Sequence, residues 1–260
     1  MLSQEERTIC IEAILEVYDT KVQTARPSAR FPHITFEDAY AISAGVAARQ
    51  QAAGSKLVGY KVGLTSTAMR RSSGIDEPDY GYLYEAFLYH DGAKIRHADF
   101  CVPRVELELA FVLSKELKGP KVNMMDVLNA TDYVVPSLEI IDTRVDEPRK
   151  IYDTIADNGA GAGLVLGGRP VRPNSVDLRM IPGILSRNSE IEETGVSCGV
   201  MGHPANGIAW LANKLFHIGE SLHPGQILLA GSYVRPIWAQ LGDTVRADFG
   251  ELGSIAVQFV

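Results

Sequence analysis

Two glutamates two residues apart, Glu106 and Glu108, lie inside the apolar segment "VPRVELELAFVL" at residues 102–113. The segment has the β-branched, apolar character of a strand, and side chains two positions apart in a strand point to the same face. Two neighbouring carboxylates repel each other, so such a face is favourable either in water or around a positive charge. Alternating polar and apolar residues also occur in any half-exposed strand, so this segment alone leaves both interpretations open.

A third carboxylate, Glu139, lies in the second apolar segment "VVPSLEIIDTR" at residues 134–144. A glutamate among apolar neighbours is rarely fully buried unless it is paired or bound to a metal. If the two segments pair as neighbouring strands, the three carboxylates converge on one point. Oxygen donors without nearby Cys or His suit Mg²⁺, Mn²⁺ or Ca²⁺ better than Zn²⁺ or Cu²⁺. Three such ligands leave about half of an octahedral shell open for water or substrate.

The elements that must position these residues are mostly short strands. Helices are expected over residues 3–24, from an N-cap at Thr35 to Gly54, after Asn123, and from Pro204 onward. Strands are expected at residues 57–64, 81–89, 104–113, 132–142, 164–168, 190–197, 226–231, 243–249 and 253–259. Many short strands and few helices after residue 75 predict an α+β fold with a mixed β-roll or barrel and peripheral helices.

The chain is expected to form one compact unit with two parts. Residues 1–72 form an N-terminal helical segment leading into the first core strand, and residues 73–260 form a catalytic mixed β-roll. The glycine-rich stretch "NGAGAGLVLGG" at residues 158–168 follows a helix-like segment and leads into a strand. A dinucleotide loop runs from strand to helix and needs GxGxxG spacing, so we expect close backbone packing here and no nucleotide.

Composition excludes several functional classes. The chain has 260 residues, of which 46% are hydrophobic, and a net charge of −7, which makes it a poor candidate for binding nucleic acid or anionic membranes. No apolar run approaches the roughly 20 residues that span a bilayer, and the charged, amphipathic N-terminus does not resemble a signal peptide. The three cysteines, Cys10, Cys101 and Cys198, fit neither a disulfide framework nor a zinc site. A reduced, cytoplasmic compartment is therefore expected.

Six motifs occur in an order that is typical of one enzyme family: "GYKVGLTS", "EPDYGYL", "PRVELELAFVL", "ATDYVVPSLEIIDTR", "DTIADNGAGAG" and "MGHPANGIAWLANKL". Together they resemble the hydratase and decarboxylase branch of the fumarylacetoacetate hydrolase superfamily, from about residue 34 to the C-terminus. This resemblance implies the fold of that family and a divalent cation, Mg²⁺ or alternatively Mn²⁺. The residues that match its metal ligands are Glu106, Glu108 and Glu139.

The resemblance also implies roles for residues whose types alone indicate nothing unusual. Lys61 in "GYKVG" could be a snorkelling surface lysine, and Asp79 in "EPDYG" suits a type I turn. In the family, residues at these positions line the substrate pocket, so Lys61 and Asp79 are expected to be catalytic. Partial burial near a cation is expected to lower the pKa of Lys61 toward that of a general base. Substrate binding is assigned to Ser232 and Arg149, with Arg70 or Arg71 as alternatives for a distal carboxylate.

The implied reaction is the addition of water to a 2-oxo or 2-hydroxy dienoic acid in aromatic meta-cleavage catabolism. The expected substrate is 2-oxohept-4-ene-1,7-dioate, which gives 4-hydroxy-2-oxoheptanedioate, and the enzyme is expected to be a homo-oligomer. The main alternative is decarboxylation of 4-oxalocrotonate (2-oxo-3-hexenedioate) or a relative. Hydrolysis of a C–C bond is less favoured, because the family's hydrolases use a His–Glu pair and His217 and Glu220 follow the end of a helix. A non-enzymatic metal-binding role is the remaining alternative.

Overall fold

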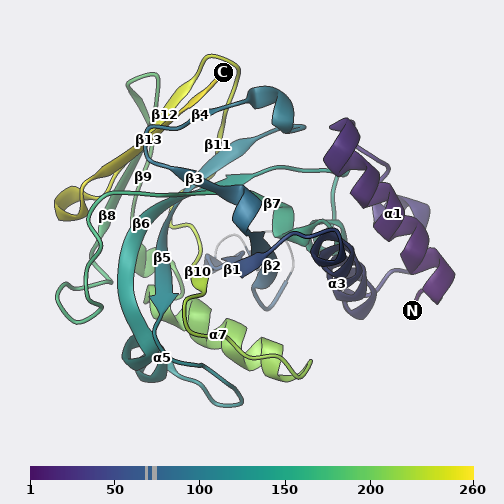
Figure 1. Ribbon diagram of the computed structural model, residues 1–260, viewed down its shortest axis with the longest axis horizontal. Helices are drawn as coiled ribbons and strands as arrows, with labels where there is room; N and C mark the ends of the chain where they lie inside the picture. Colours follow the sequence, from purple (N-terminus) through teal and green to yellow (C-terminus); the bar gives the residue numbers. More distant parts are fainter. Residues whose placement is uncertain (68–69, 72–74) are drawn as a thin grey trace.

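The protein forms two mixed β-sheets with helices around them, shown in Figure 1. The structure, a computed structural model, describes residues 1–67, 70–71 and 75–260. The larger, 8-stranded sheet has the order β2-β1-β10-β5-β6-β7-β3, with β11 paired to β5, and the 5-stranded sheet has the order β4-β13-β12-β8-β9. The strands are β1 (Leu57–Gly63), β2 (Asp79–Tyr84), β3 (Leu88–His90), β4 (Lys94–Ile95), β5 (Arg104–Leu113), β6 (Thr131–Ile141), β7 (Gly161–Leu166), β8 (Pro182–Arg187), β9 (Glu190–Val196), β10 (Ile227–Leu229), β11 (Ile237–Trp238), β12 (Thr244–Asp248) and β13 (Ser254–Phe259).

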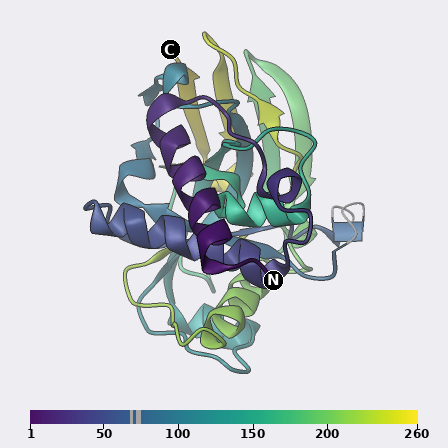
Figure 2. The ribbon, with the colours of Figure 1, turned by 90° about the vertical axis from the view of Figure 1, so that its right-hand side faces the viewer.

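The helices lie outside the sheets. They are α1 (Gln4–Thr20), α2 (Pro27–Arg30), α3 (Phe36–Ala52), α5 (Met124–Ala130), α6 (Ile151–Ala156) and α7 (Pro204–Phe216). Helix α1 packs across α3, and α3 packs on α6, as the side view in Figure 2 shows. Helix α7 lies against β1 and α5, below the larger sheet in Figure 1. None of the described helices is long and apolar enough to cross a membrane.

Local sequence signals account for most of these boundaries. Thr35 caps α3 and Asn123 caps α5, each in a complete capping box with the aspartate three residues later. Helix α1 ends at Thr20, earlier than expected, because Lys21 adopts a left-handed φ of 57°. The expected strand at residues 81–89 is divided by a 3₁₀ turn at Glu85–Phe87 into β2 and β3. Strand β8 was not expected, because a proline and a glycine at its start disfavour a strand assignment.

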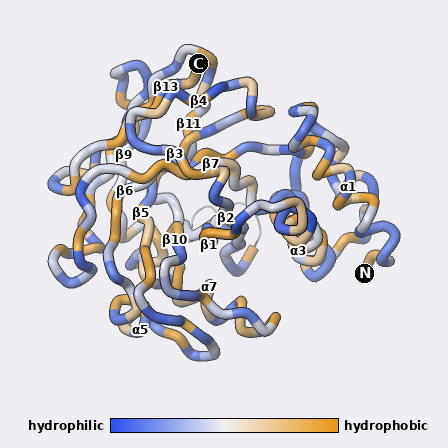
Figure 3. The backbone as a smooth tube through the Cα atoms, viewed as in Figure 1, coloured by the Kyte–Doolittle hydropathy of each residue, from blue (hydrophilic) through white to orange (hydrophobic). Residues whose placement is uncertain are grey.

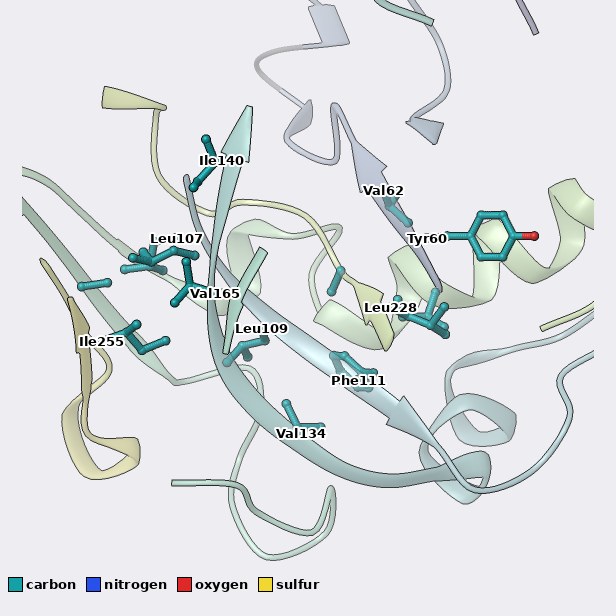
Figure 4. Close-up of a cluster of buried hydrophobic side chains, with 14 of the residues drawn as sticks. Tyr60, Val62, Leu107, Leu109, Phe111, Val134, Ile140, Val165, Leu228 and Ile255 are labelled. Atoms are coloured by element: carbon teal, nitrogen blue, oxygen red, sulfur yellow. The ribbon is translucent and has the colours of Figure 1, made fainter. Parts of the chain in front are cut away.

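The main hydrophobic core fixes which way each strand faces. Leu107, Leu109 and Phe111 of β5 are buried with Ile140 of β6 and Val165 of β7, as Figure 4 shows. Apolar stretches follow these central strands, whereas the peripheral loops are mainly hydrophilic (Figure 3). Because side chains alternate along β5, burying its odd-numbered residues in this core directs Glu106 and Glu108 to the opposite face.

The α+β fold expected from the sequence is confirmed, with parallel pairs such as β1–β10 and antiparallel pairs such as β5–β6 in one sheet. Over the described residues, the larger sheet runs from β2 at one edge to β3 at the other, so it is an open roll rather than a closed barrel. The expected boundary between residues 72 and 73 lies outside the described residues, and the two-part division stays a prediction.

Candidate metal centre and catalytic site

The strand register brings the three glutamates together. Strands β5 and β6 are antiparallel, with Glu106 directly opposite Glu139 and Glu108 opposite Ser137. One carboxylate oxygen from each glutamate lies within 4.8 Å of the others. Glu108 and Glu139 are buried and Glu106 is partly exposed. The pairing of the two acid-containing segments, expected from the sequence, is confirmed.

The electrostatics of this cluster fit a cation. Burial, followed by repulsion from the neighbouring carboxylates, raises the pKa of Glu108 well above its usual value. Burial also raises the pKa of Glu139 to about 7, although the nearby Lys61 ammonium opposes the shift. Glu108 Oε2 accepts a hydrogen bond from the backbone N–H of Gly231 at 2.8 Å. Glu108 Oε1 and both oxygens of Glu139 have no hydrogen-bond partner among the described residues. Buried, unpartnered carboxylate oxygens are the donors that Mg²⁺ and Mn²⁺ prefer, so the residues fit the implied metal.

Lys61 reaches this cluster from β1, which is separated from β6 by β10 and β5 in the sheet order. Its Nζ lies 3.3 Å from Glu139 Oε1 and donates a hydrogen bond to the carbonyl of Gly159 at 2.9 Å. Burial lowers the pKa of Lys61, but the negative charges of Glu139 and Asp79 outweigh it, so the pKa is raised. This direction is opposite to the one expected from the sequence. That expectation was made for partial burial next to a bound cation, whereas the raised pKa reflects the protein's own charges alone, which at this point are carboxylates.

Asp79 lies beside Lys61. It is buried on β2, directly opposite Gly63 of β1, and its Oδ1 has no hydrogen-bond partner among the described residues. Burial raises the pKa of Asp79, and the Lys61 ammonium opposes the shift. A side chain at position 63 would overlap Asp79 Oδ1, and its Cβ would lie 3.2 Å from Lys61 Nζ. Gly63 therefore leaves room for the aspartate and the lysine next to the three glutamates.

A cleft of about 350 Å³ leads to the cluster through Glu106. Ser232 lines this cleft, and its Oγ lies 2.8 Å from the carbonyl oxygen of Val234 and 3.1 Å from that of Leu107. The described lining consists of Val62, Gly63, Leu64, Thr65, Ser66, Glu106, Glu193, Thr194, Gly199, Ser232, Tyr233, Val234, Arg235 and Pro236. The arrangement combines a site for a hard cation, a buried lysine–aspartate pair and an entrance large enough for a small organic acid.

Residues 45–260 match the sequence family described as "Fumarylacetoacetate (FAA) hydrolase C-terminal". The chain belongs to this family. It is 48% identical over 267 aligned residues to 2-oxo-hept-4-ene-1,7-dioate hydratase of Escherichia coli, covering 100% of both chains. It is 37% identical to 2-hydroxyhexa-2,4-dienoate hydratase of Comamonas testosteroni, covering 88% of each. A solved structure of 4-oxalocrotonate decarboxylase from Pseudomonas putida G7, complexed with magnesium and adipate, superposes with a TM-score of 0.97 at 31% identity, covering 100% of this chain and 99% of the other.

Arg149 is not among the described residues that line the cleft, so its assignment to substrate binding stays a prediction. Its Nε donates to Glu147 Oε1 at 2.8 Å. Burial, followed by the charge of Arg149, lowers the pKa of Arg104 at the start of β5. Of the alternatives, Arg70 donates to the carbonyls of Leu64 and Thr65, at 2.9 and 2.8 Å, and so supports the cleft wall.

His217 and Glu220, the pair considered for a hydrolase, do not form a hydrolytic site. Both are exposed beyond the end of α7, and neither is among the described residues that line the cleft. The described lining of the cleft contains no histidine.

Sequence reasoning missed two features near the site. Tyr233 follows Ser232, and its buried hydroxyl lacks a hydrogen-bond partner among the described residues. Nothing in its sequence context sets this tyrosine apart. The turn at residues 157–161 contacts Lys61, although its sequence had indicated only close packing. The signal available there was the density of glycine after an Asp-Asn pair.

Proposed function

We propose that this chain is a divalent-metal-dependent hydratase that adds water to a 2-oxo or 2-hydroxy dienoic acid. The proposed substrate is 2-oxohept-4-ene-1,7-dioate, and the product is 4-hydroxy-2-oxoheptanedioate, within aromatic meta-cleavage catabolism. The observation that carries this proposal is the convergence of Glu106, Glu108 and Glu139 beside Lys61. It occurs in a chain that is 48% identical, over its full length, to a hydratase named for that substrate.

The roles of the residues follow from their positions. Glu106, Glu108 and Glu139 would hold Mg²⁺ or Mn²⁺, and the bound cation would supply Lewis-acid stabilisation of negative charge on the C2 oxygen of the substrate. Lys61 would hold and move a proton along the carbon chain, since its ammonium lies at the edge of the carboxylate cluster. Asp79 would orient the water, because its Oδ1 lies next to Gly63 of the cleft wall and has no hydrogen-bond partner within the described ranges.

A second candidate function is decarboxylation of a 4-oxalocrotonate-type acid. The specific observation in its favour is the TM-score of 0.97 to a decarboxylase complexed with magnesium and a dicarboxylate, adipate. Both reactions need negative charge to be stabilised on the C2 oxygen, and they differ in whether water is added or carbon dioxide is lost. Hydrolysis of a C–C bond has less support, because no histidine lines the described part of the cleft.

The deciding experiment assays the purified protein with Mg²⁺ against both substrates, with EDTA as the control. Loss of dienoate absorbance with a product heavier by one water supports the hydratase. Release of carbon dioxide from 4-oxalocrotonate, without water addition to the seven-carbon dienoate, would establish the decarboxylase instead. Turnover that is unaffected by EDTA would contradict the metal site.

Substrate binding, oligomeric state and compartment complete the proposal. Ser232 would bind the substrate, because its side chain is part of the lining of the cleft that leads to the glutamate cluster. Arg149 would attract a distal carboxylate together with Arg104, which lies on the same face of β5 as Glu106 and whose buried Nε has no hydrogen-bond partner in the part of the chain that the structure describes. We infer a homo-oligomer from the family resemblance. A cytoplasmic location is supported by the cysteines, which are free thiols.

A further inference from the structure

The turn between α6 and β7 has an unusual backbone. Asn158, Gly159 and Ala160 have consecutive φ angles of 57°, 58° and 62°. A left-handed conformation costs roughly 1–2 kcal/mol for a residue with a Cβ, but glycine and asparagine tolerate it, so Ala160 is the strained residue of the three. Strain of this kind persists only where surrounding contacts over-determine the backbone, and it clusters at functional sites.

Side chains from two directions hold this turn. The Asn158 amide pairs with both backbone groups of Tyr82 on β2: the Tyr82 N–H donates to Oδ1 at 2.7 Å, and Nδ2 donates to the Tyr82 carbonyl at 3.0 Å. The buried Arg144 guanidinium donates to Asp157 Oδ1 at 2.7 Å and to the carbonyl of Gly161 at 2.7 Å, which fixes the turn at both ends. These contacts attach the turn to β2 and to the loop after β6.

The turn presents one carbonyl to the catalytic lysine. The carbonyl oxygen of Gly159 accepts a hydrogen bond from Lys61 Nζ. The same Nζ lies 3.3 Å from Glu139 Oε1. A Cβ at position 159 would lie 3.3 Å from Lys61 Cδ, and a Cβ on Gly81 would overlap the backbone oxygen of Asn158. Glycines at both positions therefore allow the turn, β2 and the lysine to approach closely.

We propose that this left-handed turn is the positioning element of Lys61, and that Asn158 is the residue that locks it. By pairing with the Tyr82 backbone, Asn158 keeps the Gly159 carbonyl directed at Nζ, so the ammonium stays beside Glu139. Asn158 is a positioning residue, because it acts on the reaction only through Lys61. The inference rests on the proposed function, in which Lys61 moves the proton.

A double-mutant cycle on the Mg²⁺-loaded enzyme tests this role. Asn158→Ala is expected to lower kcat by roughly 10- to 100-fold, since a misplacement of about 1 Å costs this much. The KM and the Mn²⁺ Kd from calorimetry should change by less than about threefold, because coupling through Lys61 leaves the glutamates in place. In the Lys61→Met background the same substitution should cost no further activity, and an equal loss in both backgrounds would overturn the proposal.

Asn188 provides the matched control. It too is left-handed, with a φ of 53°, and its amide donates to Asp243 Oδ1 at 2.6 Å and accepts from the N–H of Thr244 at 2.9 Å. It lies in the turn between β8 and β9 of the smaller sheet. Asn188→Ala should reduce stability in a comparable way while leaving kcat unchanged. If the two alanine variants lose kcat equally, the effect is general destabilisation and the proposal fails.

A second readout does not depend on the reaction. The ¹⁵N signal of the Lys61 ammonium, assigned by its loss in Lys61→Met, should shift or broaden in Asn158→Ala and stay unchanged in Asn188→Ala. Asn158→Gly removes the same amide while relieving the positive φ, so it should fold even if the alanine variant does not. An unchanged ammonium signal in Asn158→Gly would overturn the positioning role. If the wild type hydrates no dienoate but the Asn158 variants still shift the ammonium signal, only the proposed function is contradicted.

Discussion

Replacing Glu139 by glutamine is expected to shift metal affinity and metal-free stability in opposite directions. The substitution keeps the shape of the side chain and removes one charge from a cluster whose oxygens lie within 4.8 Å of one another. At an effective dielectric constant of about 20, each pair of carboxylates at that distance repels by about 3.5 kcal/mol, or about 7 kcal/mol for two. The lost attraction to Lys61 at 3.3 Å is about 5 kcal/mol on the same scale.

The repulsion that the substitution removes exceeds the attraction that it loses by about 2 kcal/mol, so the metal-free variant is the more stable protein when all three wild-type carboxylates are ionised. Because the pKa of Glu139 is about 7, this gain is complete only at higher pH, at about pH 8.5. For a chain of this size, a gain of about 2 kcal/mol in stability raises the Tm of the metal-free variant by about 4–8 °C. Metal binding should weaken at least about 100-fold, since losing a group that merely supports a metal ligand already costs about 10- to 100-fold.

Calorimetric titration with Mn²⁺ and thermal unfolding of the EDTA-treated protein measure the two quantities. Asp142→Asn is the matched control, since Asp142 is also buried but accepts hydrogen bonds from the backbone N–H groups of Cys101 and Val102. It should lower the Tm and leave the Mn²⁺ affinity unchanged. An unchanged Mn²⁺ Kd in Glu139→Gln, or a metal-free Tm that falls as in the control, would refute the three-carboxylate site.

Three further predictions follow from the same geometry. Lys61→Met should lower kcat by roughly 10²–10⁴ while Mn²⁺ affinity stays equal or improves; a kcat within about threefold of wild type would make Lys61 a structural residue. Arg149→Ala should raise the KM for the seven-carbon diacid more than that for 2-hydroxypenta-2,4-dienoate, and equal effects would exclude a role at the distal carboxylate. Because the folded-state pKa of Glu139 is raised to about 7, its stabilising contribution is complete below its unfolded pKa and is lost as pH rises through about 7. The metal-free Tm should therefore fall between about pH 5 and pH 8, and saturating Mg²⁺ should flatten the profile; a flat metal-free profile would contradict the clustering.

The sequence by itself determined the local features. The two-residue period of a strand puts Glu106 and Glu108 on one face whatever the rest of the chain does. The capping boxes at Thr35 and Asn123 fixed where two helices begin, because their hydrogen bonds join residues three apart. The order of the motifs was sufficient to identify the family, which the match over residues 45–260 confirms.

The tertiary structure alone decided which distant residues meet. Glu106 lies opposite Glu139 because burial of the alternate residues of both strands sets their register, and a slip of one residue would turn Glu139 to the other face. Lys61 and Glu139 are three strand positions apart, about 14 Å on a flat sheet at the usual strand spacing, yet their charged atoms lie 3.3 Å apart. Only the curling of the sheet, together with the reach of a long lysine side chain, closes that distance. A strained turn directs the Gly159 carbonyl at the lysine. Curvature and strain of this kind depend on how all the strands pack together, so no short stretch of sequence specifies them.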